Sequence, residues 1–105
     1  MARERILVVD TDLDHLSRLY LALLHRKYRT EACNNPEEIQ DRTKRFKPSL
    51  IILYDSEYEI IKDRLKIPAI VFGMEAPLKV NDGDTFLKKP IQIEQLLKKV
   101  EEILF

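Results

Sequence analysis

The chain has 105 residues, 45% of them hydrophobic, which suits one domain over residues 1–105 and leaves no room for two. Lysine plus arginine and aspartate plus glutamate number 18 each, so the formal net charge is zero and direct binding to nucleic acid, which normally needs a basic excess, is disfavoured. No apolar run approaches the length of a membrane helix, so we expect no contact with a membrane and a cytoplasmic location.

Strand and helix patterns alternate in the first half of the chain. Residues 6–9 are a continuous apolar run, typical of a strand buried on both faces, and leucines spaced by threes and fours predict a helix over residues 12–27. Residues 28–33 form a short second strand. A capping asparagine followed by proline then predicts a helix over residues 35–45, which Pro48 terminates.

The second half repeats this alternation with shorter helices. Residues 50–53 are another fully apolar run and the natural central strand, and a short polar helix follows over residues 57–66. Residues 67–72 form the fourth strand. Residues 74–80 have room for at most a turn or two of helix before the fifth strand at residues 85–87.

An apolar stripe over residues 93–104 predicts a closing helix, so strand and helix alternate five times along the chain. Parallel strands need crossover helices, and right-handed crossovers place these helices on both faces of the sheet. The pattern therefore predicts an α/β fold with a doubly wound, five-stranded parallel sheet.

Ligand sites in such sheets form beyond the carboxyl ends of the strands, and several candidate residues stand there. They are Asp10, Thr11, Asp12, Tyr54, Asp55, Gly73 and Lys89. Carboxylates gathered with a lysine indicate a site for a hard cation and a phosphoryl group, because Mg²⁺ prefers oxygen ligands and lysine neutralises phosphate. Acidic residues at strand ends also cap helices, so spacing alone leaves both interpretations open.

Five segments, taken in order, resemble the receiver domain of response regulators, the signalling proteins of bacterial two-component systems, over essentially the whole chain. The segments are ILVVDTDLDHLSRLYLALL, YRTEACNNPEEI, KPSLIILYD, IPAIVFG and FLKKP. This resemblance implies a flavodoxin-like sheet with strand order 2-1-3-4-5, a cis peptide bond before Pro90, and a role in phosphorelay signalling through a protein partner.

Receiver domains hold Mg²⁺ with two consecutive acidic residues after the first strand, and only the first of them is matched here. Asp10 stands at the first position, whereas Thr11 stands at the second. Asp12 falls one position later, where it is better placed to cap the helix. The resemblance therefore implies a magnesium site that has lost one carboxylate.

The phosphoacceptor of the family is an aspartate six residues after the proline of the KP pair. Counted from Pro48, this position holds Tyr54, and Asp55 lies one place beyond it. Because side chains alternate along a strand, we expect Asp55 to point away from the direction of Tyr54. Gly73 stands where the family has a threonine or serine that binds the phosphate, and glycine has no hydroxyl group.

The remaining family positions are partly retained. Lys89 and Pro90 match the Lys-Pro signature, and Phe86 stands at the aromatic switch position without a phenolic hydroxyl. The intervals between the motifs are shorter than the family norm, which implies that the third and fourth helices are shortened. The fourth helix is part of the surface that receivers usually offer to partners, so we expect this surface to differ from that of other receiver domains.

These departures favour a degenerate receiver, or pseudo-receiver, that is not an enzyme, needs no cofactor and acts by binding a protein partner. One alternative is a phosphoaccepting regulator in which Asp55 takes the phosphoryl group and Asp10, Asp12 and Asp55 hold Mg²⁺. Another is a dimerisation domain of a larger regulator, with a homodimer as the functional form.

Three further features have simple structural interpretations. Cys33, the single cysteine, predicts a small buried side chain in a strand and excludes an internal disulfide. His15 and His25 are ten residues apart on one helix, so they cannot share a metal and we expect both on the surface. The basic clusters at residues 25–29 and 42–47 lie at predicted helix ends, where cations complement the helix dipole; an acidic partner surface is the alternative.

Overall fold

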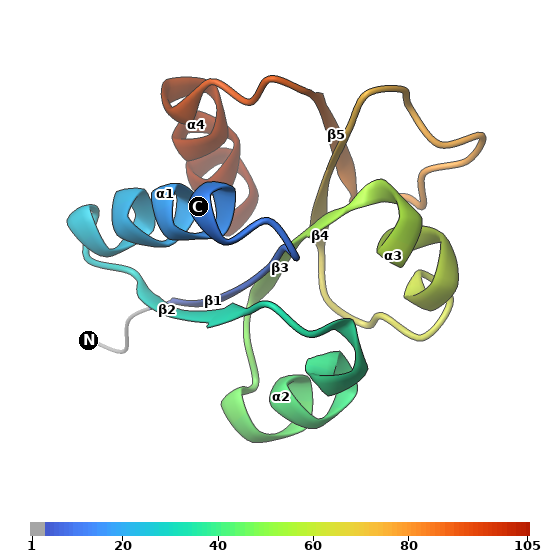
Figure 1. The fold of residues 1–105 in the computed structure, drawn as a ribbon, viewed down its shortest axis with the longest axis horizontal. Helices are drawn as coiled ribbons and strands as arrows, with labels where there is room; N and C mark the ends of the chain where they lie inside the picture. Colours follow the sequence, from blue (N-terminus) through green and yellow to red (C-terminus); the bar gives the residue numbers. More distant parts are fainter. Residues whose placement is uncertain (1–3) are drawn as a thin grey trace.

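The computed structural model describes residues 4–105, which form one five-stranded parallel sheet with helices packed on both faces (Figure 1). The strands are β1 (Arg5–Val9), β2 (Arg29–Cys33), β3 (Leu50–Tyr54), β4 (Ala69–Gly73) and β5 (Thr85–Lys88). Within these residues the strand order is β2-β1-β3-β4-β5 and every neighbouring pair is parallel. The predicted α/β fold and its flavodoxin-like strand order are therefore confirmed.

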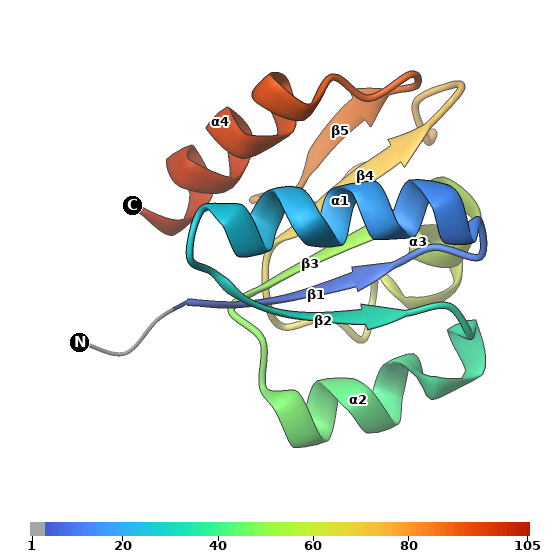
Figure 2. The same cartoon turned by 60° about the vertical axis from the view of Figure 1, so that its left-hand side comes forward.

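Two layers of helices cover the sheet. They are α1 (Leu13–His25), α2 (Ile39–Phe46), α3 (Asp55–Ile61) and α4 (Ile93–Leu104), with a 3-10 turn at Pro36–Glu38 ahead of α2. The helices α1 and α4 pack on one face of the sheet, whereas α2 and α3 pack on the other (Figure 2). None of the helices in residues 4–105 is both long and apolar enough to cross a membrane.

The core consists of two layers because alternate side chains of each strand point to opposite faces. On β3, Leu50 and Ile52 pack in the layer of α1 and α4, whereas Ile51 and Leu53 pack in the layer of α2 and α3. All four side chains are fully buried. Burial on both faces explains why this strand is a continuous apolar run rather than an alternating one.

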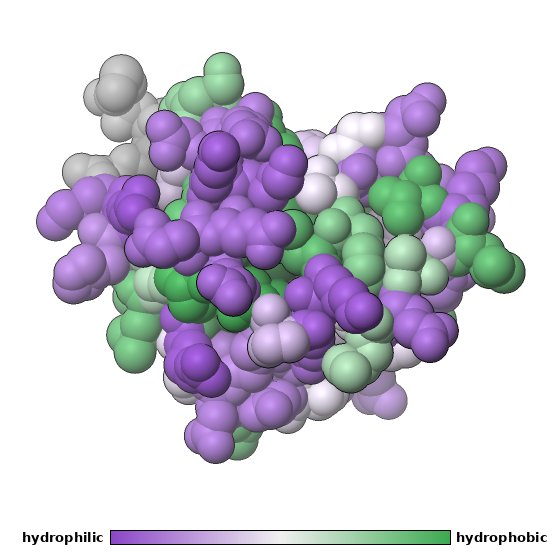
Figure 3. All heavy atoms as spheres, turned by 90° about the horizontal axis from the view of Figure 1, so that it is seen from above, coloured by the Kyte–Doolittle hydropathy of each residue, from purple (hydrophilic) through white to green (hydrophobic). Residues whose placement is uncertain are grey.

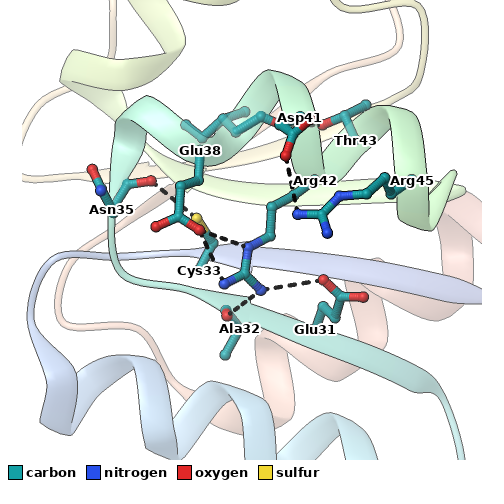
Figure 4. A network of polar contacts seen from close by, with 10 residues as sticks. Glu31, Ala32, Cys33, Asn35, Glu38, Asp41, Arg42, Thr43 and Arg45 are labelled. Atoms are coloured by element: carbon teal, nitrogen blue, oxygen red, sulfur yellow. Dashed lines mark hydrogen bonds and ion pairs between the residues drawn. The ribbon is translucent and has the colours of Figure 1, made fainter.

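The helix α2 is tied to the edge strand β2 through the guanidinium group of Arg42 (Figure 4). This group donates to the carboxylates of Glu31 and Glu38 at 3.2 Å each, and to the backbone carbonyl of Ala32 at 3.3 Å. The helix ends where Lys47 adopts a left-handed conformation with φ of 51°, immediately before the proline that was expected to stop it. Arg42 thus satisfies an edge carbonyl and orients the helix.

The helix α3 is shorter than the sequence predicts. It begins at Asp55 rather than residue 57 and ends at Ile61 rather than residue 66. The chain turns immediately after the helix, because the N–H of Arg64 donates to the carbonyl of Ile61 at 2.8 Å, the tighter spacing of a 3-10 turn.

The connection between β4 and β5 also differs from the expected turn of helix. Across the described chain, residues 74–84 contain no helix, and they turn near Gly83, whose φ of 88° favours glycine. Met74 and Leu78 are exposed large hydrophobic side chains of this connection. At the right-hand end of Figure 3, where the connection lies, separate hydrophobic groups stand among hydrophilic ones. Shortening of the fourth helix is therefore more complete than predicted, since the helix is replaced by a loop.

Partly buried hydrogen bonds hold this loop against the sheet. The hydroxyl of Tyr58, on α3, donates to Asp84 at 2.7 Å and accepts from the N–H of Asn81 at 2.9 Å. The other carboxylate oxygen of Asp84 accepts the N–H of Ala69 at 2.9 Å. Asp84 therefore links α3, β4 and the start of β5.

Candidate functional site

The carboxyl end of β1 presents one buried carboxylate, that of Asp10. Asp10 follows Val8 by two positions, so it lies on the face of the sheet that α1 covers, and it is only 3% exposed. One of its oxygens accepts the N–H of Asp12 at 3.0 Å, and the other contacts the Nδ1 atom of His15. A buried carboxylate needs such partners, because desolvation of an unpaired charge is costly.

His15 is the main functional residue that sequence reasoning misses. It was expected on the surface, but its side chain is only 16% exposed and points to Asp10. The imidazole also meets the ring of Phe72 edge to face, with centroids 5.1 Å apart. The available signal is the spacing: His15 precedes the buried Leu19 by four residues and therefore shares the inward stripe of α1.

Tyr54 occupies the end of β3, at the position that the receiver resemblance assigns to the phosphoacceptor. Its ring is half-buried and lies 6.2 Å from the ring of Phe72. Burial raises the pKa of the Tyr54 hydroxyl, the negative charges of Glu57 and Asp10 add to this, and a hydrogen bond with Thr11 lowers it. With its pKa raised, the Tyr54 side chain is an uncharged phenol. Its aromatic ring therefore stands where the resemblance places a carboxylate.

Asp55 lies on the other side of the strand. Its carboxylate rests against Gly73, so closely that a Cβ atom added at Gly73 would be 2.5 Å from Oδ2. The Oδ1 atom accepts the N–H of Ser56 at 2.8 Å. Alternation along β3 and β4 accounts for this placement, because residues 53 and 71 face the layer of α2 and α3, and Asp55 and Gly73 follow them by two positions.

The acidic residues therefore do not form a magnesium site. Asp12 uses its carboxylate to cap α1, where it accepts the N–H groups of Asp14 and His15 at 3.1 and 3.2 Å. Asp10 is held by His15, and Asp55 rests against the end of β4. Over residues 4–105, no three histidine, cysteine or acidic side chains are grouped as metal ligands. These residues do not fit a bound Mg²⁺ ion.

The Lys-Pro pair closes the site on the side of β5. The Nζ atom of Lys89 lies 5.3 Å from the centroid of the Phe72 ring, a cation–π contact, and the backbone N–H of Lys89 donates to the carbonyl of Gly73 at 2.8 Å. The peptide bond between Lys89 and Pro90 is cis, as the resemblance implied. Phe86, at the position that the resemblance assigns to the aromatic switch, is half-buried in the layer of α2 and α3.

A hollow of about 330 Å³ remains beside these residues, between α1 and the segment after β5. It is lined by Asp12, Asp14, His15, Arg18, Met74, Lys89, Pro90, Ile91 and Ile93. Of the candidate residues, only Asp12, Lys89 and Pro90 border this hollow, whereas Asp10, Tyr54, Asp55 and Gly73 do not. The structure thus does not bring all the candidate residues around one hollow. It also shows that His15 contacts Asp10 and that Phe72 contacts His15, Tyr54 and Lys89.

No protein-family model matches the chain, and no curated protein matches its sequence. Solved structures do match. A response regulator receiver domain protein (CheY-like) from Methanospirillum hungatei JF-1 is 23% identical, with a TM-score of 0.85 over 98% of this chain and 94% of that chain. A two-component response regulator from Clostridium difficile is also 23% identical, with a TM-score of 0.80 over 97% and 96%. The signal receiver domain of a response regulator from Bermanella marisrubri is 19% identical, with a TM-score of 0.79 over 99% and 100%. The chain therefore has the fold of response-regulator receiver domains.

Proposed function

We propose that this chain is a receiver-like signalling domain that is not phosphorylated and acts by binding a protein partner in the cytoplasm. The observation that carries this proposal is the contact between His15 and the buried carboxylate of Asp10. The imidazole of His15 contacts the carboxylate of Asp10, which a metal ion would need as a ligand. Without a bound cation, the charge of a transferring phosphoryl group is not neutralised.

Two further contacts support the proposal. Tyr54 fills the position of the phosphoacceptor with an aromatic ring that packs beside Phe72. Asp55, the nearest carboxylate along the chain, rests against Gly73 on the opposite side of the strand. A phosphoryl group on Asp55 would therefore lie on the face of the sheet opposite to that of Asp10. The matched folds, whose names describe receiver domains, support a signalling role rather than an enzymatic one.

Amide NMR spectra with Mg²⁺ and beryllofluoride, an analogue of the phosphoryl group, test the proposal. We expect no saturable shifts at Asp10 or Asp55 in the unmodified chain. Intact mass after incubation with acetyl phosphate should likewise show no adduct. Saturable shifts at both aspartates, or an adduct that Asp55→Asn abolishes, would instead favour the phosphoaccepting alternative.

A rebuilt variant provides the matched control. The substitutions Thr11→Asp, His15→Leu and Tyr54→Asp restore two carboxylates and remove the imidazole from Asp10. We expect this variant to show shifts that depend on Mg²⁺ and beryllofluoride together. Gain of binding in the variant would assign the loss to these three side chains. Sedimentation of the unmodified chain separates the remaining alternative, a dimerisation domain, because that role needs a stable dimer.

A further inference from the structure

A groove of about 460 Å³ lies between α2 and the end of α3, remote from the candidate site. Its floor contains Ile39 and Ile61, which are buried, and its walls include the half-buried Leu65 and Ile67. Four aliphatic side chains in one open hollow are sufficient to accept aliphatic side chains from a partner. The function proposed above uses none of these residues.

The rim of this groove is positively charged. Lys44 projects from α2, and Arg64 and Lys66 stand on the turn between α3 and β4. All three are exposed, and none of them forms an ion pair with any of residues 4–105. No carboxylate lines the groove. No ion pair among the described residues therefore competes with a partner's carboxylates for these three cations.

The opposite flank of α2 is different, although it is also basic. There, Arg42 is held by Glu31 and Glu38, and Arg45 is paired with Asp41 at 3.0 Å (Figure 4). These carboxylates neutralise the arginines within the chain itself. Of the two basic flanks, the groove side is the one that combines unneutralised charge with an apolar floor.

This combination also constrains the identity of the partner. Symmetric pairing of two copies through the groove would bring Lys44, Arg64 and Lys66 against their own counterparts, and like charges repel. Nucleic acid would use the cations but gain little from an aliphatic floor. An amphipathic protein helix with acidic flanks uses both, because its apolar face fills the groove while its carboxylates meet the rim.

We propose that the groove between α2 and α3 is a docking site for an acidic, amphipathic helical segment of a partner protein. The partner's aliphatic side chains lie on Ile39, Ile61, Leu65 and Ile67, and its carboxylates pair with the three rim cations. This inference rests on the proposed function only in that the domain works by binding protein. It holds whether or not Asp55 accepts a phosphoryl group.

The test uses the full chain and a synthetic helical peptide that carries leucines on one face and glutamates on both flanks. NMR titration should give saturable amide shifts in α2 and over residues 61–67, with none at Asp10. A second peptide, with its leucines replaced by serines, should bind at least about tenfold more weakly, because it loses the apolar contact. This comparison requires no change to the protein, so it does not depend on the folding of a variant.

Charge reversal on the protein provides the second arm. Lys44→Glu, Arg64→Glu and Lys66→Glu together should weaken binding by about tenfold or more. The matched control reverses three exposed lysines outside the groove, Lys79, Lys88 and Lys98, which changes the net charge equally. We expect the control to stay within about twofold of the unmodified chain, since only long-range attraction changes.

Several results would overturn the inference. These are absence of saturable binding, equal affinity for the leucine and serine peptides, equal losses in the two triple variants, or stronger competition from a single-stranded oligonucleotide. The beryllofluoride spectra report on Asp10 and Asp55 and not on the groove. The beryllofluoride spectra can therefore contradict the proposed function while the peptide titration supports the docking site, and the reverse is also possible.

Discussion

Asp10 and Asp84 both place a carboxylate among hydrogen-bond donors, but the partners come from very different distances along the chain. Asp10, after β1, is bound by the N–H of Asp12 and by His15, which are two and five residues away. Asp84, before β5, is bound by Ala69 and Tyr58, which are 15 and 26 residues away. The first cluster is local to one strand–helix junction, whereas the second joins separate parts of the fold.

This difference indicates that the hydrogen bonds of Asp10 and those of Asp84 have different structural roles. The bonds of Asp84 connect α3 with the loop that stands in place of a helix between β4 and β5, so they support the tertiary structure. The bonds of Asp10 lie at the end of β1, a strand that is already packed on both faces. We therefore expect loss of Asp84 contacts to reduce stability more than loss of the contact between Asp10 and His15.

Asp84→Ala should have the largest effect. It leaves the buried Tyr58 hydroxyl and the Ala69 N–H without their acceptor, and we expect the free energy of unfolding to fall by about 3 kcal/mol. Urea unfolding followed by circular dichroism measures this change. The control is Asp82→Ala, an exposed carboxylate in the same turn, which should change stability by less than about 0.5 kcal/mol. Equal effects of the two substitutions would contradict a supporting role for Asp84.

His15→Leu should have an intermediate effect. The substitution keeps an apolar contact with Phe72 but leaves Asp10 with one backbone donor, so we expect a loss of about 1–2 kcal/mol. His25→Leu, at the exposed end of α1, is the matched control and should be close to neutral. If His15→Leu destabilises as strongly as Asp84→Ala, the distinction between the two clusters is wrong.

Near neutral pH, titration of the Tyr58 hydroxyl should give the smallest change of the three, because its effect on stability appears only at alkaline pH. Burial raises the pKa of Tyr58 to about 12, with the hydrogen bond to Asp84 acting in the same direction, against an ordinary value of 10.0. A raised pKa means that the folded state prefers the protonated phenol. The stabilisation is therefore complete below pH 10 and is lost as the pH rises towards 12. Tyr58→Phe should lack this part of the pH dependence, and urea midpoints at about pH 9 and about pH 11 measure the difference.

Much of the fold follows from local patterns. The continuous apolar runs at residues 6–9 and 50–53 lie on β1 and β3, which are buried on both faces as predicted. Cys33 is buried at the end of β2, as expected for a small apolar side chain in a strand. These features depend on the period of the side chains and on which of them avoid water, and both are visible in a single segment.

The candidate site is only partly accessible to the same reasoning. Alternation along a strand indicates that Tyr54 and Asp55 point in different directions, and the structure has them apart, near Phe72 and Gly73 respectively. The direction of His15 is harder to foresee, because a histidine next to a buried stripe is compatible with either solvent or a buried carboxylate. Only the position of Asp10 beneath the first turn of α1 decides between them.

The sequence by itself determines the order of elements, the parallel sheet, the capping residues Asp12 and Asn35, and the presence of Thr11 and Tyr54 where the resemblance places acidic residues. The tertiary structure alone decides that His15 contacts Asp10, that Tyr58 and Asp84 hold a loop in place of a helix, and that an apolar groove opens beside α2. The physical reason is range. Periodicity and capping act over a few residues, whereas a buried hydrogen bond or a groove depends on the distance between segments that only packing brings together.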